Sequence, residues 1–380
     1  MNSNDYSSTE AGHVRRTSEG YDTFIPTPLP PTLQYSPELV LALSRADAVL
    51  SELSGLARNL PNPHLLITPY VRREAVLSSR IEGTQSTLAD LLLDEAVGRR
   101  GEAPETADVR EVSNYVKALD HGIARLASLP LSLRLVRELH ETLMRGVRGD
   151  HATPGEFRRS QNWIGPPGCT LATATYVPPP PHDMLAALDD WEKFLHVRDK
   201  LPDLIQCALL HEHFEAIHPF LDGNGRIGRL LITLFLIERG RLSQPLLYLS
   251  DYIESHRDEY YRRLQRIRTH GDWAAWLHYF LTAVEESGKK ALRQAGELMD
   301  LRETLRVQFP DKPRLVLLMD ALFMNPYITV KHAAEVLGVS QPTAKRNLEM
   351  LMAAGVMEET TGKAWGKVYL ARPILEAIER

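Results

Sequence analysis

The densest group of reactive side chains lies between positions 218 and 229, which read His-Pro-Phe-Leu-Asp-Gly-Asn-Gly-Arg-Ile-Gly-Arg. An imidazole titrates near neutral pH, so His218 is suited to act as a general base. Asp222 supplies a carboxylate of the kind that holds Mg²⁺ against bound phosphates. The segment therefore predicts a base and a metal ligand within a few residues of each other.

The same segment also has the features of an anion-binding turn. Gly223 and Gly225 allow the backbone to turn with its N–H groups outward, at the start of an expected helix whose N-terminus carries partial positive charge. Arg226 and Arg229 are spaced i,i+3 on the first helical turn, where guanidinium groups can hold phosphate oxygens. A single His before proline, or a single Gly-Asn-Gly turn, is usually structural. Together, these groups indicate phosphate chemistry.

The segment resembles the signature of the Fic family, H-x-F-x-[D/E]-G-N-G-R-x-x-R, and matches every fixed position. The resemblance continues through Gly155-Glu-Phe-Arg-Arg, Gln161-Asn-Trp-Ile-Gly, Val177-Pro-Pro-Pro-Pro and Tyr260-Tyr261, over roughly residues 20 to 290. It implies a protein adenylyltransferase, a nucleotidyltransferase that moves AMP from ATP to a Ser, Thr or Tyr hydroxyl of a protein. The target would be another protein or the chain itself.

The resemblance also assigns roles to single residues. His218 would deprotonate the target hydroxyl, Asp222 would bind Mg²⁺, and Arg229 would pair with the γ-phosphate. Relatives that transfer a whole γ-phosphate carry Lys at the second glycine of the turn, so Gly225 argues against that reaction. The expected contacts of ATP are Glu82, His218, Gly223, Asn224, Gly225, Arg226, Ile227, Gly228, Arg229, Tyr261 and Leu264.

Of these contacts, Tyr261 and Leu264 fall where relatives sandwich adenine. Two tyrosines on an amphipathic helix are about as often core residues as pocket residues, so both readings stay open.

A second motif, Ser78-Ser-Arg-Ile-Glu82-Gly83, precedes the core. Its Ser78 and Glu82 are spaced i,i+4 on one helix face, and Gly83 can end that helix. An acidic residue near a helix end is usually a solvated surface charge. The segment nevertheless resembles the family's inhibitory pattern [S/T]-x-x-x-E-[G/N], in the class with an N-terminal inhibitory helix. Glu82 would then occupy the donors of Arg229 that the γ-phosphate needs.

Composition limits the number of domains, the cellular location and the kinds of partner that we expect. The 380 residues, 43% hydrophobic and 24% charged, suffice for two or three domains. Cys169 and Cys207 are too few for a disulfide framework or a four-ligand zinc site, which favours a cytoplasmic location. Apolar runs are too short to span a membrane, so we expect no membrane partner. A net charge of −5 means that nucleic-acid binding would need a local basic patch.

Apolar periodicity predicts helices over most of the chain. The expected ranges are 37–59, 68–79, 88–96, 107–127, 132–144, 184–195, 201–217, 227–238 and 257–281. Prolines and glycines between positions 162 and 181 favour an exposed hairpin or loop. By resemblance, residues 164–177 would be a flap that aligns a target segment by strand addition. An ordinary surface loop is the alternative, and Thr170, Thr173, Thr175 and Tyr176 are conceivable sites of self-modification.

The final segment changes character after Pro310-Asp-Lys-Pro. Residues 329–348 look like a helix-turn-helix in which Ser340 caps the second helix and Pro342 lies in its first turn. Residues 356–370 would form a two-stranded wing. Residues 311–380 hold nine Lys or Arg and eight Asp or Glu, a net of +1. Because many winged helices bind proteins, DNA contact stays open; its candidates are Lys345, Arg346, Lys363 and Lys367.

We therefore predict a mainly α protein, with a Fic-type helical core, a β-hairpin flap and a small C-terminal winged-helix domain. The expected divisions are a disordered N-terminus at 1–24, an N-terminal helical region at 25–140 with the inhibitory helix at about 70–84, a Fic core at 141–290, a helical linker at 291–312 and a winged helix at 313–380.

Two other functions compete with this prediction. One is a DNA-binding regulator whose Fic core only senses nucleotide. The other is a Fic transferase of different chemistry, using another nucleotide or removing AMP. The target protein, the signal that would release Glu82, and whether the chain forms a homodimer stay open at this point.

Overall fold

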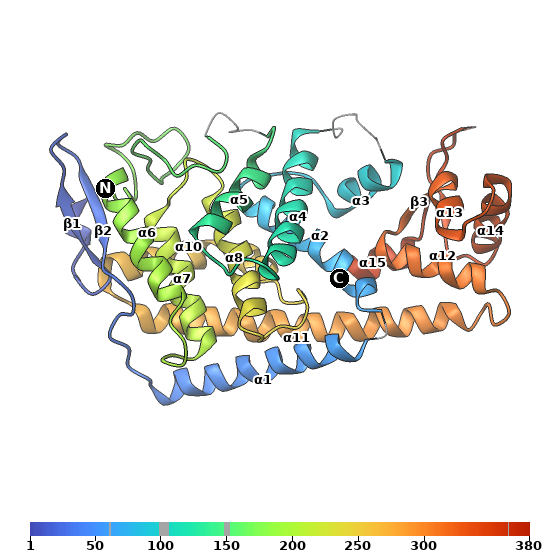
Figure 1. Ribbon diagram of the computed structural model, residues 1–380, viewed down its shortest axis with the longest axis horizontal. Coiled ribbons are helices and arrows are strands. Elements are labelled where there is room, and N and C mark those ends of the chain that lie inside the picture. Colours follow the sequence, from blue (N-terminus) through green and yellow to red (C-terminus); the bar gives the residue numbers. More distant parts are fainter. Residues whose placement is uncertain (61, 99–105, 148–152, 364) are drawn as a thin grey trace.

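The computed structural model describes residues 1–60, 62–98, 106–147, 153–363 and 365–380. The prediction of a mainly helical fold is confirmed. Two long helices, α1 (Pro37–Asn59) and α11 (Trp273–Arg306), run side by side along one edge of the molecule (Figure 1). Ser36 caps α1 and is followed by Pro37 at the first helical position, a sequence typical of helix starts. Other helices of the core, among them α7, pack against this pair.

The centre of the core is a pair of buried helices, α7 (Asp203–Ile217) and α8 (Asn224–Glu238). Every residue of α7 from Leu204 onward is buried, as expected for a helix with neighbours on all sides. Around the pair lie α4 (Ala107–Leu126), α5 (Leu133–Met144), α6 (Pro181–Leu195) and α11. The turn at 218–223 that joins α7 to α8 carries the sequence motif.

Helix α2 (His64–Ile81) runs along the core and ends at the second motif. It packs against α4, α8 and the short helix α9 (Ser250–Ser255). After α2 the chain turns into α3 (Leu88–Val97), which Thr87 and Asp90 cap reciprocally and which Gly98 ends in a left-handed conformation. These packing contacts fix the end of α2 beside the start of α8.

The expected single helix at 257–281 is wrong, because it is two helices. Helix α10 (Arg257–His270) ends at Gly271, whose φ of +68° a side chain would disfavour. Asp272 then accepts a hydrogen bond from the backbone N–H of Ala275 and caps α11. Apolar spacing continues across this break, which is why periodicity alone missed it.

The expectation of disorder at 1–24 is also wrong. A short 3-10 helix, η1 (Ser3–Asp5), precedes the antiparallel hairpin of β1 (Gly12–Arg16) and β2 (Asp22–Pro26). Phe24 is buried, and its N–H donates to the carbonyl of Val177 at 2.9 Å. The Thr23 hydroxyl donates to the carbonyl of Pro178 at 2.7 Å. These long-range contacts order a segment that has no local apolar pattern.

The expected hairpin between residues 162 and 181 is mostly irregular. One antiparallel bridge joins Ile164 to Tyr176, and the Thr175 and Tyr176 N–H groups both donate to the carbonyl of Ile164. Between these anchors the chain forms turns. The segment is a loop closed at its base by strand pairing.

The C-terminal part comprises α12 (Pro313–Met324), β3 (Tyr327–Thr329), α13 (Val330–Leu337), α14 (Gln341–Ala353), β4 (Glu358–Glu359), β5 (Val368–Leu370) and α15 (Arg372–Glu379). Its strands form an antiparallel sheet of order β3-β5-β4. Helices α12 and α15 contact α2, so this part rests on the core (Figure 1). Among the described residues, no helix is both long and apolar enough to cross a membrane.

Candidate active site

His218 lies directly after α7, in a left-handed backbone conformation with φ of +50°. Such a φ is uncommon for a residue with a side chain, and it turns the chain sharply out of the helix. The His218 N–H donates to the carbonyl of Phe214 at 2.9 Å and so closes the last turn. Phe220 anchors the turn in the core, stacked on the His140 ring at a centroid distance of 3.7 Å.

Asn224 holds the turn in shape. Its side chain accepts from the Phe220 N–H and donates to the Phe220 carbonyl, each at 2.8 Å. The amide is buried, so Asn224 offers a ligand its backbone and not its side chain. The Asp222 carboxylate accepts from the Gly223 N–H at 2.6 Å and is 52% exposed. The rigid turn thus presents Asp222 to solvent beside the start of α8.

The two arginines of the motif point in different directions. The buried Arg226 guanidinium lies 3.2 Å from Glu111 Oε2 on α4 and 3.6 Å from Asp222 Oδ1. The buried Arg229 donates through Nε to the Ser78 hydroxyl and through Nη2 to the Ser78 carbonyl, both at 2.9 Å. The structure therefore joins the end of α2 to the motif through Arg229.

Glu82 completes this connection as the residue that ends α2. Its Oε1 accepts from Arg229 Nη2 at 2.7 Å. Burial alone would raise the pKa of Glu82, but the Arg229 charge and hydrogen bond outweigh it and hold the pKa below its usual value. For Arg229, burial lowers the pKa, and the Glu82 charge reverses the shift and raises it. Both groups are therefore charged at neutral pH.

Gly225 leaves room for this contact in its present geometry. A Cβ atom at position 225 would lie 2.3 Å from Glu82 Oε1 and 2.9 Å from Arg229 Nη1. The absent side chain lets the Glu82 carboxylate reach the N-terminus of α8, where backbone dipoles favour negative charge. Glu82 thus occupies the position that the sequence assigned to an anion.

The His218 side chain is 19% exposed. Burial, followed by the Arg158 and Arg268 charges, lowers its pKa to about 3, while Glu82 raises it in part. The imidazole is therefore neutral at pH 7 and able to accept a proton. The Glu215 carboxylate lies 4.0 Å from His218 Nδ1, and burial raises the pKa of Glu215 to about 7.

A Mg²⁺ ion would fit this site only together with a phosphate ligand. In the described residues, no group of three or more His, Cys, Asp or Glu side chains could hold a metal. Mg²⁺ commonly takes one or two carboxylates and completes its shell with water and substrate phosphates. The half-exposed Asp222 beside the anion turn meets that requirement as a single ligand.

The other expected nucleotide contacts divide into exposed and buried residues. Tyr261 on α10 is 41% exposed, with the Arg257 guanidinium 5.8 Å from its ring centre. Leu264 is buried, and Tyr260 is a core residue whose hydroxyl lies 2.8 Å from His211 Nε2. Of the two tyrosines, only Tyr261 is open to a ligand.

Two further motif positions serve packing. Ile227 is buried, and a Cβ at Gly228 would lie 2.6 Å from Glu215 Oε1. Gly228 therefore permits α7 and α8 to approach closely. A side chain at this position would point towards α7.

The four candidate DNA contacts lie elsewhere. Lys345 and Arg346 are exposed on α14, and Lys363 and Lys367 lie between β4 and β5. This part of the chain is at the far end of the molecule from α8 (Figure 1). The structure does not bring these residues to the site of His218.

The sequence argument missed several side chains that hold the site. Arg158 donates to the His218 carbonyl at 3.0 Å, and Asn162 donates to the Phe220 carbonyl at 2.8 Å. His140 lies 3.1 Å from the Asp222 carbonyl. Arg158 and Asn162 belong to the segments Gly155-Glu-Phe-Arg-Arg and Gln161-Asn-Trp-Ile-Gly. The family resemblance therefore included both residues, but it assigned neither of them a role.

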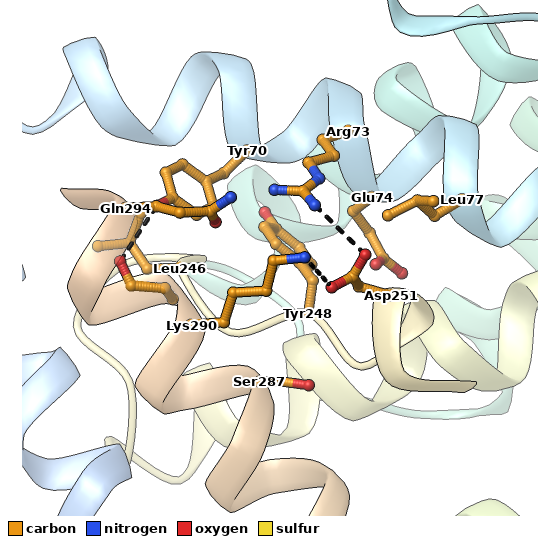
Figure 2. A pocket seen from close by; sticks show the side chains of 11 residues that line it. Tyr70, Arg73, Glu74, Leu77, Leu246, Tyr248, Asp251, Ser287, Lys290 and Gln294 are labelled. Atoms are coloured by element: carbon orange, nitrogen blue, oxygen red, sulfur yellow. Dashed lines mark hydrogen bonds and ion pairs between the residues drawn. The ribbon is translucent and has the colours of Figure 1, made fainter. Parts of the chain in front are cut away.

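A different face of α2 lines a cavity of about 30 Å³ against α9 and α11 (Figure 2). At its mouth, Asp251 pairs with Arg73 at 3.3 Å and with Lys290 at 2.6 Å. Inside, Glu74 Oε1 accepts hydrogen bonds from the Ser250 hydroxyl at 2.6 Å and from the Tyr115 hydroxyl at 3.0 Å. Burial raises the pKa of Glu74 to about 7. These contacts fix α2 one turn before Ser78.

Comparison with known proteins gives two adjoining family matches. Residues 40–124 match the Fic/DOC family N-terminal region, and residues 130–236 match the Fic/DOC family. A protein adenylyltransferase Fic from Drosophila grimshawi is 28% identical over 212 residues, covering 54% of this chain and 40% of the relative. One from Aedes aegypti is 29% identical over 170 residues, covering 44% and 30%. The chain thus spans well under half the length of these relatives.

Two solved structures share the fold. A Fic family protein from Desulfovibrio desulfuricans G20 has a TM-score of 0.58 and 22% identity, covering 90% of this chain and 98% of its own. A Fic domain containing signaling protein from Bacteroides thetaiotaomicron has a TM-score of 0.50 and 20% identity, covering 68% and 95%. At these identities the likeness concerns the fold alone.

Proposed function

This chain is a Fic/DOC-family protein, and we propose that it is a protein adenylyltransferase that transfers AMP from ATP to a protein hydroxyl and is autoinhibited by Glu82. The observation that carries the proposal is the Glu82–Arg229 ion pair at the start of α8, next to the neutral base His218. The curated relatives named protein adenylyltransferase support the reaction.

His218 would act on the incoming hydroxyl. A hydroxyl is a weak nucleophile at pH 7, so its proton must be accepted as its oxygen attacks the α-phosphorus. The imidazole is neutral at pH 7 and is therefore in the form that can accept this proton, although burial makes it a weaker base than a free imidazole. A new O–P bond forms while the bond between the α- and β-phosphates breaks, so AMP stays on the target and pyrophosphate leaves.

The start of α8 would bind the triphosphate. The N–H groups of the turn at Gly223 and Gly225 and the helix dipole favour anionic oxygens there. Mg²⁺ held by Asp222 would neutralise phosphate charge when bound. Arg229 would take the γ-phosphate, and Tyr261 on α10 would cover the adenine. These roles rest on the family motif and on the exposure of Asp222 and Tyr261.

Autoinhibition would follow from competition for one guanidinium. Three donor contacts of Arg229 are already taken by Ser78 and Glu82. A γ-phosphate would have to displace the Glu82 carboxylate or stay misplaced, which moves the α-phosphorus out of line with the attacking oxygen. The isolated protein should therefore have little transferase activity.

The decisive experiment uses the Glu82→Gly variant, ATP labelled at its α-phosphate, and cell lysate. Labelled protein bands that require Glu82→Gly support AMP transfer and inhibition together. Mass spectrometry of the added group separates AMP from another nucleotide. If neither the variant nor the parent labels any protein, the transferase proposal fails.

A second function is favoured by one observation in the C-terminal part. Trp365, between β4 and β5, is 90% exposed and lies between Lys363 and Lys367. We propose that residues 313–380 form a winged helix that binds nucleic acid, because exposed aromatic rings beside cations suit base stacking and phosphate contact. Lys345 and Arg346 on α14 would add phosphate contacts.

Fluorescence anisotropy with labelled duplex and single-stranded DNA tests this second function. Trp365→Ala should weaken binding, whereas Leu185→Ala, which removes a smaller exposed apolar side chain on α6, should not. The proposal fails if the parent protein does not bind DNA at low salt. It also fails if Trp365→Ala leaves DNA binding unchanged.

A further inference from the structure

Arg158 lies at the junction between the loop at 162–181 and the turn that carries His218. It is 2% exposed. Its Nε donates to the His218 carbonyl at 3.0 Å, and its Nη2 donates to the Ile217 carbonyl at 3.4 Å. On the other side it donates to the Ser160 carbonyl at 3.2 Å and to the Pro179 carbonyl. One side chain thus ties both segments together.

The guanidinium is held by carbonyl dipoles. In the described part of the chain no carboxylate forms an ion pair with Arg158, although most other buried arginines of the core have one. Burial lowers the pKa of Arg158 to about 10, so it still carries its charge at neutral pH. An uncompensated buried cation is costly for stability. Its position beside His218 points to a role in the site.

We propose that Arg158 is the positioning residue of the base: it fixes the left-handed backbone at His218 and holds that turn against the ends of the loop at 162–181. Its positive charge also favours the neutral imidazole, as a smaller effect than burial. This inference rests on the proposed transferase function in so far as it concerns catalysis. The bonded carbonyls of Ile217 and His218 flank the very residue whose φ is positive. Without the guanidinium, the Ile217 carbonyl would lose its side-chain donor and the His218 carbonyl would keep only the longer contact from Asn162 at 3.3 Å.

The charges that face His218 come from four segments. Arg158 and Arg268 on α10 lower the pKa of His218, after burial itself, whereas Glu82 on α2 raises it. Glu215 on α7 lies 4.0 Å from Nδ1. Because Arg158 contributes more than the other charges, its removal should raise the pKa of His218.

The same contacts set the distance between base and target. Ser160 and Pro179 stand at the two ends of the loop proposed to align the target segment, and Asn162 adds a 3.3 Å contact to the His218 carbonyl. A target docked on this loop would therefore meet the imidazole at a fixed spacing. Loss of this connection should lower kcat more than it changes the KM for ATP.

Two substitutions separate the effect of the Arg158 charge from the effect of its hydrogen bonds to the four carbonyls. Arg158→Met removes both, and Arg158→Lys keeps the charge but cannot reach four carbonyls at once. Arg159→Met is the matched control, because the neighbouring Arg159 is 86% exposed and pairs only with Glu156 at 2.9 Å among described residues. All three are made in the Glu82→Gly protein and compared by thermal unfolding first.

The first measurement is the titration of the His218 imidazole by NMR, which needs no activity. Arg158→Met should raise its pKa by about one unit or more, while Arg158→Lys and Arg159→Met leave it nearly unchanged. A folded Arg158→Met protein with the parental His218 titration overturns the electrostatic role. If Arg158→Met does not fold, a neutral Arg158→Gln variant takes its place in this comparison.

The second measurement is AMP transfer across pH. Arg158→Lys should lower kcat about tenfold or more with a KM for ATP within twofold of the parent. A parental kcat in Arg158→Lys overturns the positioning role. If the Glu82→Gly parent itself transfers no AMP, the proposed function fails, and the NMR titration still decides whether Arg158 controls His218.

Discussion

Glu82 Oε1 and Arg229 Nη2 lie 2.7 Å apart although 147 positions separate them in the sequence. The contact joins the end of α2 to the first turn of α8. It is supported from the side by Ser78, which gives Arg229 two more acceptors. The inhibitory role proposed for this pair leads directly to the first prediction.

Glu82→Gly should raise self-modification by about a hundredfold or more, because the freed Arg229 can place the γ-phosphate and align the α-phosphorus. Transfer is measured with α-labelled ATP. Adding Arg229→Ala should return the activity towards that of the parent, a non-additive result expected only if both residues share one function. An additive double variant would contradict the competition.

His218→Ala, made in the Glu82→Gly protein, should reduce AMP transfer by at least about a hundredfold, because the target hydroxyl loses its proton acceptor. ATP affinity, followed by calorimetry, should change little, since the imidazole acts on the hydroxyl. Near-normal transfer by this variant would remove His218 as the base.

Asp222→Ala should abolish the dependence of transfer on Mg²⁺ concentration and lower its rate, because the phosphates lose their bridging cation. The carboxylate is half exposed, so thermal stability should stay within a few degrees of the parent. A Mg²⁺ titration identical in variant and parent would exclude this role.

The proposed inhibition by Glu82 should be insensitive to mild acid. A carboxylate whose folded pKa lies below its unfolded value contributes stability above the unfolded pKa, near 4.3, and loses it as the pH falls through the folded pKa. Glu82 has such a lowered pKa. Parental activity should therefore stay low between pH 5.5 and about 8, and activation within that range would point to another titrating group.

The contribution of Glu74 to stability should depend on pH in the opposite direction. Its pKa is raised to about 7, so its contribution to stability is present below the unfolded pKa and is lost as the pH rises through the folded one. Thermal unfolding of Glu74→Gln should consequently depend less on pH between 5 and about 8 than the parent does. Glu141→Gln, which changes an exposed residue paired with Arg145, is the control.

The local patterns of the sequence predicted much of this architecture. Apolar periodicity predicted the range 37–59 of α1, and the motif between α7 and α8 indicated an anion turn at a helix start. The i,i+4 spacing of Ser78 and Glu82 placed both on one helix face, which is the face that meets Arg229. Each of these features is encoded within a few residues.

Features that depend on distant contacts could not be predicted in this way. The hairpin of β1 and β2 is ordered by bonds from Thr23 and Phe24 to residues beyond 170. Nothing near Arg158 shows that it will meet the carbonyl of His218, 60 positions later. The roles of His218, Asp222 and Glu82 in catalysis and inhibition stay predictions until the variants are measured.

The close approach of Glu82 to position 225 constrains how such sequences can diverge. Any side chain at 225 would collide with the carboxylate, because even a Cβ would lie 2.3 Å from Oε1. A descendant that acquires a larger residue there must at least move the carboxylate at the end of α2 away from its present position. Positions 82 and 225 should therefore vary together across relatives, so that a larger residue at 225 marks a chain in which this carboxylate no longer lies beside Arg229.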